Sequence, residues 1–125
     1  MLKKSVTAIL IVSAWLAVTC GNLFAAIPAV ERQALIALYN STDGANWRNN
    51  TNWLGEPGTE CTWYGVSCDW ENLHVIEIQL CEYDDEAIFC YGNKLRGTIP
   101  SELGNLSNLE SLNLSHNLTT VHFFR

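Results

Sequence analysis

A periodic pattern of leucines, glycines and asparagines constrains the fold of this chain most strongly. It reads Asn93-x-Leu95-x-Gly97-x-Ile99-Pro100-x-x-Leu103-Gly104-x-Leu106-x-x-Leu109-x-x-Leu112-x-Leu114-x-x-Asn117, and the interval from Asn93 to Asn117 is its period. Within it we expect a short strand that points Leu112 and Leu114 inward, while Ser111 and Asn113 project from the other side. An asparagine at the turn can hydrogen-bond backbone groups of its own turn and of the neighbouring coil, which leucine cannot do. One such coil cannot bury its apolar side alone, so the pattern indicates stacked coils.

The same register occurs once more upstream, where residues 75–80 alternate apolar and polar as a half-buried strand does. The aligned positions are Val75 with Leu109, Ile78 with Leu112, and Leu80 with Leu114. The interval from Leu80 to Leu114 exceeds the period by ten positions. The ten extra residues begin with Cys81 and end with Cys90. We therefore expect an inserted loop at the end of the first strand, closed by a Cys81–Cys90 disulfide.

A helix and then an irregular segment precede this strand. Apolar residues recur at helical spacing from Pro28 to Asn40, and proline suits the first helical position. From residue 45 to 70 neither a helix nor a strand period is present, although the segment holds Trp47, Trp53, Trp63 and Trp70. Aromatic rings at this density usually form a small cluster that packs a loop-rich cap. A platform for stacking a ligand is the functional alternative.

In these features the chain resembles the plant-type leucine-rich repeat proteins, a subfamily that is also widespread in bacteria and algae. The repeat part of the resemblance is carried by Leu95-Arg-Gly-Thr-Ile-Pro-Ser-Glu-Leu-Gly-Asn-Leu106 and by the repeat after it. Four upstream segments resemble the family's N-terminal cap: Ala34-Leu-Ile-Ala-Leu-Tyr39, Asn46-Trp47, Asn52-Trp53 and Cys61-Thr-Trp-Tyr-Gly-Val-Ser-Cys68.

The resemblance implies an α/β fold, in which a fragment of a leucine-rich repeat solenoid carries a disulfide-stapled N-terminal cap made of the helix and the irregular Trp-rich segment. It also implies that Cys61 pairs with Cys68 and that the helix covers the open end of the solenoid. Members of the family generally bind proteins, peptides or glycans through the concave surface of their strands. We expect four segments: a signal peptide at 1–25, the cap at 26–72, about one and a half repeats at 73–118 with the inserted loop at 81–90, and an off-register tail at 119–125.

Residues 1–25 have the pattern of a secretory signal peptide. Lys3 and Lys4 precede an apolar run from Val6 to Val18, which is shorter than the ~20 residues that span a bilayer. We expect export, so that the mature chain is secreted, periplasmic or held at the cell surface, without a membrane span. Lipid anchoring at Cys20 is the weaker alternative. Four cysteines remain after removal of the signal, and an even number in an exported chain favours two disulfides.

The mature chain is acidic. Removal of residues 1–25 takes away two of the seven basic residues and none of the 13 acidic ones, which leaves a net charge of −8. This balance argues against nucleic acid as a partner, because binding to phosphates requires a basic face.

No catalytic constellation or cofactor motif occurs in the sequence. His74, His116 and His122 have no partner at metal-ligand spacing, and the cysteines lack the C-x2-C spacing of zinc and redox sites. We therefore expect neither an enzyme nor a cofactor nor a metal ion. A run of carboxylates could hold calcium weakly, although a solvated loop tip is the commoner role of such a run. The run consists of Glu82, Asp84, Asp85 and Glu86.

The candidate binding surface is the concave face of the two strands together with the inserted loop. It would consist of Glu77, Gln79, Ser111, Asn113, Ser115 and His116, with Tyr83 and Phe89 of the inserted loop as aromatic anchors. An ordinary solvated surface is the alternative for all of these residues. Two strands offer far less than the ~800 Å² per partner of a standard interface, so we do not expect this fragment alone to bind tightly.

The repeat pattern ends abruptly after Asn117. The family would place one residue there, then a leucine and a Gly-x-Ile-Pro run, whereas this chain reads Leu118-Thr-Thr-Val-His-Phe-Phe-Arg125. We interpret the loss of register as a truncated or frame-shifted reading frame. The last coil would then present an uncovered apolar face, so we expect a marginal fold or self-association through that end.

These observations predict an exported leucine-rich repeat interaction module that binds a protein, peptide or glycan partner non-covalently. The module would be the truncated N-terminus of a receptor-like or signalling protein. The alternative is a frame-shifted or truncated structural remnant without a partner.

Overall fold

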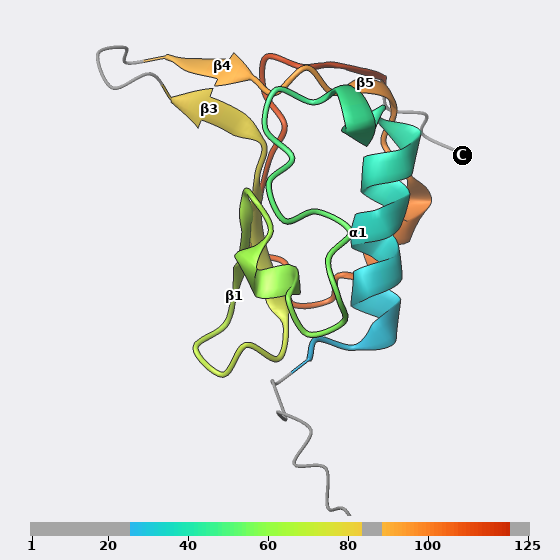
Figure 1. Cartoon of the computed structure of the whole chain (residues 1–125), viewed down its shortest axis with the longest axis vertical. Coiled ribbons are helices and arrows are strands. Elements are labelled where there is room, and N and C mark those ends of the chain that lie inside the picture. Colours follow the sequence, from blue (N-terminus) through green and yellow to red (C-terminus); the bar gives the residue numbers. More distant parts are fainter. Residues whose placement is uncertain (1–25, 84–88, 121–125) are drawn as a thin grey trace, which may run out of the picture.

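The structure is a computed structural model that describes residues 26–83 and 89–120 (Figure 1). A long helix, α1 (Ala29–Ser41), stands beside a layer of short strands and irregular coil. The strands are β1 (Val66–Cys68), β2 (Val75–Gln79), β3 (Cys81–Tyr83), β4 (Cys90–Gly92), β5 (Arg96–Thr98), β6 (Ser111–Asn113) and β7 (Leu118–Thr120). Short 3-10 helices connect them at η1 (Gly44–Asn46), η2 (Glu60–Thr62) and η3 (Ser101–Asn105). The predicted signal peptide, the alternative lipid site at Cys20 and the acidic residues Asp84, Asp85 and Glu86 lie outside the described residues.

Helix α1 confirms the predicted helix, with each end one residue later. Pro28 precedes the first helical turn, where its missing N–H has no helical partner to lose. The helix buries Ala34, Leu35 and Leu38 completely. It packs against η1, η3 and β5, and therefore forms one wall of the core.

Three of the four tryptophans form the predicted cluster, together with Tyr39. Ring centroids lie 5.2 Å apart for Tyr39 and Trp47, 4.8 Å for Trp47 and Trp53, and 5.1 Å for Trp53 and Trp63. These indoles are buried, and each indole N–H donates a hydrogen bond, so the alternative of a ligand-stacking platform is wrong for them. The prediction is wrong for Trp70, which is 89% exposed. It lies in the turn between β1 and β2, beyond the reach of the cluster.

A three-stranded sheet in the order β1-β2-β6 faces this core. Strands β2 and β6 are parallel, and Ile78 lies opposite Leu112, which confirms the register that the sequence alignment predicted. Strand β1 pairs with β2 in the antiparallel direction. The sequence did not predict β1, because so short a strand cannot show a period of two.

The disulfide between Cys61 and Cys68 is present and joins η2 to β1, as the family resemblance implied. The inserted segment forms a hairpin in which Cys81 lies opposite Gly92, and Cys90 lies opposite Tyr83. The two cysteines therefore stand diagonally across the strands. Their thiols are hydrogen-bonded to each other and are not joined in the structure, so the second disulfide stays a prediction.

Asn117 makes the hydrogen bonds that its position predicts. Its Nδ2 donates to the carbonyl oxygen of Leu80 in the neighbouring coil and to that of Leu114 in its own turn, both at 3.0 Å. Its Oδ1 accepts the N–H of Leu95, also at 3.0 Å. One side chain thus joins three backbone segments, which a leucine could not do.

The two last described strands leave leucines exposed. In the parallel pair β5–β7, Leu118 lies opposite Arg96. The separation of these two residues in sequence is two positions shorter than the interval from Asn93 to Asn117. The side chain of Leu118 is 72% exposed. Leu112 was expected to point inward, yet it is 45% exposed. The reason is that β6 is an edge strand, which no other described strand of its sheet covers.

Candidate functional site

Four of the predicted site residues lie together on the parallel pair β2–β6. Glu77 lies opposite Ser111, and Gln79 lies opposite Asn113. Because alternate residues of a strand point to the same face, these four side chains share one side of the sheet. Ser111 is exposed and the other three are half-buried, so the strands present the small polar face that the sequence predicted.

The β3–β4 hairpin closes one end of this face. The Sγ atom of Cys81 accepts hydrogen bonds from Gln79 Nε2 and from Asn113 Nδ2, both at 3.4 Å. The Sγ atom of Cys90 lies 3.1 Å from the hydroxyl of Ser115. Gln79, Asn113 and Ser115, three of the predicted site residues, therefore have hydrogen-bond partners within the molecule. Glu77 and Ser111 form the open part of the face.

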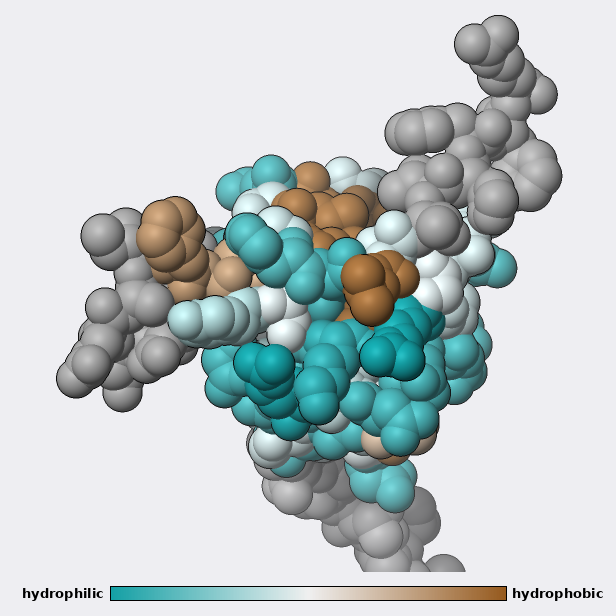
Figure 2. All heavy atoms as spheres, turned by 90° about the horizontal axis from the view of Figure 1, so that it is seen from above, coloured by the Kyte–Doolittle hydropathy of each residue, from teal (hydrophilic) through white to brown (hydrophobic). Residues whose placement is uncertain are grey.

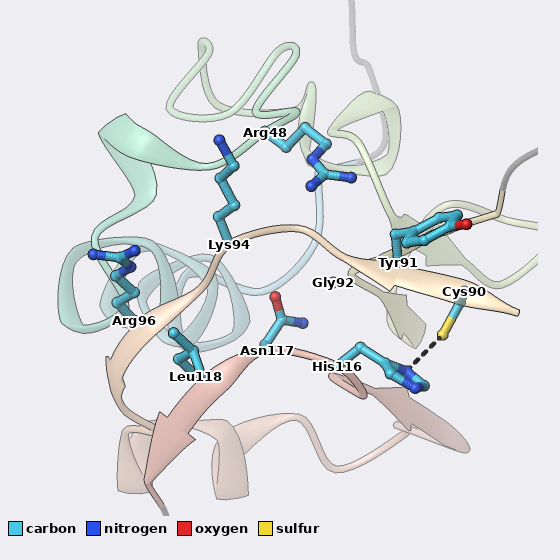
Figure 3. Close-up of a pocket in the computed structure, with 9 residues that line it drawn as sticks. All are labelled: Arg48, Cys90, Tyr91, Gly92, Lys94, Arg96, His116, Asn117 and Leu118. Carbon is cyan, nitrogen blue, oxygen red and sulfur yellow. Dashed lines mark hydrogen bonds between the residues drawn. The ribbon is translucent and has the colours of Figure 1, made fainter.

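Cys90 also contacts His116, whose Nδ1 lies 3.4 Å from the Sγ atom (Figure 3). The hydrogen bond with Cys81 and, after it, the one with Ser115 lower the pKa of the Cys90 thiol, and His116 acts in the same direction. A lowered pKa favours the thiolate, which is the form that reacts with oxidants and disulfides.

The aromatic residues of the hairpin differ from the predicted anchors. Phe89 is 71% exposed just before β4, as an anchor requires. The side chain of Tyr83 lies outside the described ones. Tyr91, which the sequence analysis did not select, is 49% exposed in the middle of β4. Since strand residues alternate, Tyr91 points away from the side on which Cys90 contacts Ser115.

A hollow of about 320 Å³ lies beside the hairpin, between the cap and the repeat (Figure 3). Its lining residues are Arg48, Cys90, Tyr91, Gly92, Lys94, Arg96, His116, Asn117 and Leu118. A Cβ atom on Gly92 would lie 1.7 Å from the carbonyl oxygen of His116. Only glycine therefore allows β4 to lie this close to the backbone of His116. Of these residues, His116 was predicted from the sequence as part of a binding surface, and the three basic residues Arg48, Lys94 and Arg96 were not. No local motif marks these three residues. The sequence signal is only that they are three of the five basic residues after residue 25.

Buried Asn93 holds the cap against the repeat at this hollow. Its Oδ1 accepts the N–H of Asn49 at 2.7 Å, and its Nδ2 donates to the carbonyl oxygen of Asn49 at 2.8 Å. The carbonyl oxygen of Asn93 accepts the N–H of Arg48 at 2.9 Å. These bonds hold the backbone of Arg48 against the segment that carries Lys94.

A second contact that the sequence did not reveal joins α1 to β2. Glu31 is 2% exposed; its Oε1 lies 2.7 Å from His74 Nδ1, and its Oε2 accepts the N–H of Val75 at 2.8 Å. The hydrogen bond with Glu31 raises the pKa of His74 above its ordinary value. His74 is therefore a structural partner of the helix, and its role depends on pH.

Residues 26–83 and 89–120 contain no group of three or more His, Cys, Asp or Glu side chains arranged to hold a metal ion. Over the same ranges, no helix has the length and apolar character needed to cross a membrane.

Residues 28–69 match the family described as the leucine-rich repeat N-terminal domain. The chain is similar to the LRR receptor-like serine/threonine-protein kinase FEI 2 of Arabidopsis thaliana, with 37% identity over 65 residues that cover 52% of this chain and 9% of that protein. It is 30% identical over 122 residues to the leucine-rich repeat receptor-like serine/threonine-protein kinase RGI4 of the same plant, covering 78% of this chain and 10% of RGI4. It is 33% identical over 91 residues to receptor-like protein 50, also from Arabidopsis thaliana, covering 73% of this chain and 8% of that protein.

The chain spans a tenth or less of the length of these relatives. The matched region contains α1, the buried tryptophans and the Cys61–Cys68 disulfide. It belongs to an N-terminal domain of repeat proteins, which is not a catalytic domain. The matches and the geometry agree that this chain is a plant-type leucine-rich repeat protein whose residues 28–69 form its N-terminal cap.

Proposed function

We propose that this chain is the recognition end of an exported leucine-rich repeat protein, which binds a protein, peptide or glycan partner without covalent chemistry. The parallel register of β2 and β6 carries the proposal, because it sets Glu77 beside Ser111 on an open polar face. Solenoid proteins bind through surfaces that grow in this way, one strand per stacked coil. The receptor-like names of the relatives support a role in recognition.

The proposal includes the division into a signal peptide at 1–25, a cap at 26–72, repeats at 73–118 with the inserted loop at 81–90, and a tail at 119–125. Export is supported by the Cys61–Cys68 disulfide, because disulfides persist in oxidising compartments. Mass spectrometry of the secreted protein checks the boundary of the signal peptide. We expect the mature chain to begin at Ala26, and an intact Met1 would contradict export by signal cleavage.

The binding test presents the exported chain to arrays of extracellular proteins, peptides and glycans. Glu77→Arg should weaken the binding of a true ligand about tenfold, because it reverses a charge at the centre of the open face. Glu102→Arg is the matched control, since Glu102 is exposed on η3 and the change in net charge is the same. If no ligand of any class binds, the alternative of a remnant without a partner is favoured. If both variants lose binding equally, net charge explains the effect and the strand face is not the binding surface.

Self-association is a second role, favoured by the exposed leucines of the last two strands, Leu112 and Leu118. Removal of apolar surface from water would stabilise a contact between copies by about 25 cal/mol per Å². Sedimentation equilibrium of Leu112→Ser and Leu118→Ser should show less dimer than the parent chain. Val30→Ser is the control, because Val30 is 48% exposed on α1. A parent chain that stays monomeric at every concentration would contradict this role.

A further inference from the structure

The basic residues of this acidic protein gather at one end. Five basic residues follow residue 25, against 13 acidic ones. Arg32 forms an ion pair with Glu60, and Arg125 lies outside the described residues. The remaining three line the same hollow: Arg48, Lys94 and Arg96. Figure 2 shows this end of the molecule, where strongly hydrophilic side chains cover much of the surface between small, separate apolar areas.

The ion pairs among the described residues do not involve these three cations: one joins α1 to η2, and the other joins α1 to His74, just before β2. Asp43 is the carboxylate that lines a neighbouring hollow with Lys94 and Arg96. Its Oδ1 accepts a hydrogen bond from Asn46 Nδ2 at 2.8 Å. Asp43 therefore offsets part of the charge of Lys94 and Arg96, whereas the described residues that line the hollow with Arg48 include no carboxylate.

Backbone hydrogen bonds fix the segments that carry the three cations. The N–H of Arg48 donates to the carbonyl oxygen of Asn93 at 2.9 Å, and that of Arg96 donates to Thr42 at 3.0 Å. Lys94 lies between them with a positive φ of 62°, a conformation that non-glycine residues seldom adopt. Like charges repel, so their concentration here raises the free energy of the empty hollow, and a bound anion would lower it.

The charged groups themselves are the donors of this hollow. Figure 3 shows Lys94 reaching toward the cap segment that carries Arg48, while Tyr91 and His116 lie on opposite sides of β4, with His116 against Cys90. The guanidinium of Arg48 offers a planar fork of N–H donors, and the ammonium of Lys94 offers three more that can rotate. A group with acceptor oxygens on several sides suits this pair better than a planar carboxylate does.

We propose that this hollow binds a tetrahedral oxyanion, the sulfate or phosphate group of an acidic ligand. Arg48 and Lys94 supply the charge that holds it and donate hydrogen bonds to its oxygens. The site is separate from the strand face of Glu77 and Ser111. Binding of an anion in the hollow does not depend on whether that strand face binds a partner. Because its cations are exposed, the affinity for a single inorganic anion is low, with a Kd on the order of 10 mM.

The test follows backbone amide NMR shifts of the whole exported chain during titration with sodium sulfate, sodium phosphate and sucrose octasulfate at constant ionic strength. We expect saturable shifts at Arg48, Gly92, Lys94 and His116 with each anion that binds. Unsulfated sucrose and sodium chloride should leave these amides unchanged. Tighter binding of sucrose octasulfate than of phosphate identifies sulfated saccharides as the source of the group, and the reverse order identifies free phosphate.

Arg48→Gln and Lys94→Gln should each weaken binding about three- to fivefold, the effect of removing one exposed charge from a cluster. Lys94→Arg should retain binding, because it keeps the charge. Ser107→Glu is the matched control: it lowers the net charge by one unit, as Arg48→Gln does, at an exposed position outside the hollow.

Either of two results would overturn the proposal. One is a loss of affinity in Ser107→Glu equal to that in Arg48→Gln, since net charge alone would then explain the binding. The other is a set of shifts that chloride reproduces at the same ionic strength, which would mean screening and not a site. Circular dichroism of each variant verifies that the fold is kept.

Discussion

Asn93 and Asn49 bind each other through two hydrogen bonds between the side chain of the first and the backbone of the second, at 2.7 and 2.8 Å. Asn117 stands one period after Asn93, and its side chain bonds the carbonyl oxygen of Leu80 in the preceding coil. The same residue type therefore joins the second coil to the first and the first coil to the cap. The hollow with its three cations lies where these two asparagines join the segments.

Asn93→Ala should lower the free energy of unfolding by about 2–3 kcal/mol, because the N–H and carbonyl of Asn49 both lose a partner at a buried contact. Urea denaturation followed by tryptophan fluorescence measures the change. Asn108→Ala at an exposed position is the control, with an expected change within about 0.5 kcal/mol. Equal effects in the two variants would show that Asn93 does not join the cap to the repeat.

The contact of His74 with Glu31 should make stability depend on pH. The hydrogen bond with Glu31 raises the pKa of His74 above 6.5 in the folded chain. Its contribution is therefore complete below pH 6.5, the ordinary pKa, and is lost as the pH rises through the folded value. Thermal unfolding between about pH 5 and 8 should show Tm falling more steeply in the parent chain than in His74→Gln. Parallel pH profiles would exclude this linkage.

Substitution of two tryptophans should have opposite outcomes. Trp63 is 1% exposed within the aromatic cluster, so Trp63→Ala should cost about 3–5 kcal/mol of stability. Trp70 is 89% exposed, so Trp70→Ala should change stability by less than about 0.5 kcal/mol. Denaturant titration followed by circular dichroism compares the two. A large loss in Trp70→Ala would place Trp70 in the core and contradict the burial described above.

Oxidation should join Cys81 to Cys90. The two thiols are hydrogen-bonded, and the lowered pKa of Cys90 favours the reactive thiolate. Peptide mapping of the exported protein should find the two residues in one disulfide-linked fragment. Closure of so short a loop would stabilise the fold by about 2.5 kcal/mol relative to Cys81→Ser/Cys90→Ser. Alkylation of both thiols in the unreduced protein would exclude the second disulfide.

The local pattern was enough to predict several elements. The alternation of residues 75–80 and its alignment with the second repeat predicted that Ile78 would lie opposite Leu112, and it does. The helical spacing after Pro28 predicted α1 to within one residue. These predictions succeed because period and register are properties of adjacent residues, and burial of one apolar face then selects one pairing.

Other features could not be predicted in this way. Strand β1 is too short to show a period, and the tryptophans look equivalent in sequence although Trp70 lies outside the cluster. Glu31 and His74 stand 43 residues apart, and nothing in their local context indicates that they pair. Such contacts depend on how separate segments stack.

The sequence by itself determined the kind of fold, because periodic leucines and turn asparagines specify which side of each coil is apolar and where each coil turns. The tertiary structure alone decided where the scarce positive charge gathers. Arg48 comes from the cap loop and Lys94 from the first repeat turn, and strands β1 to β4 separate them along the chain. The hydrogen bonds of Asn93 bring the backbones that carry them together, because side chains distant in sequence meet through the packing of the segments to which they belong.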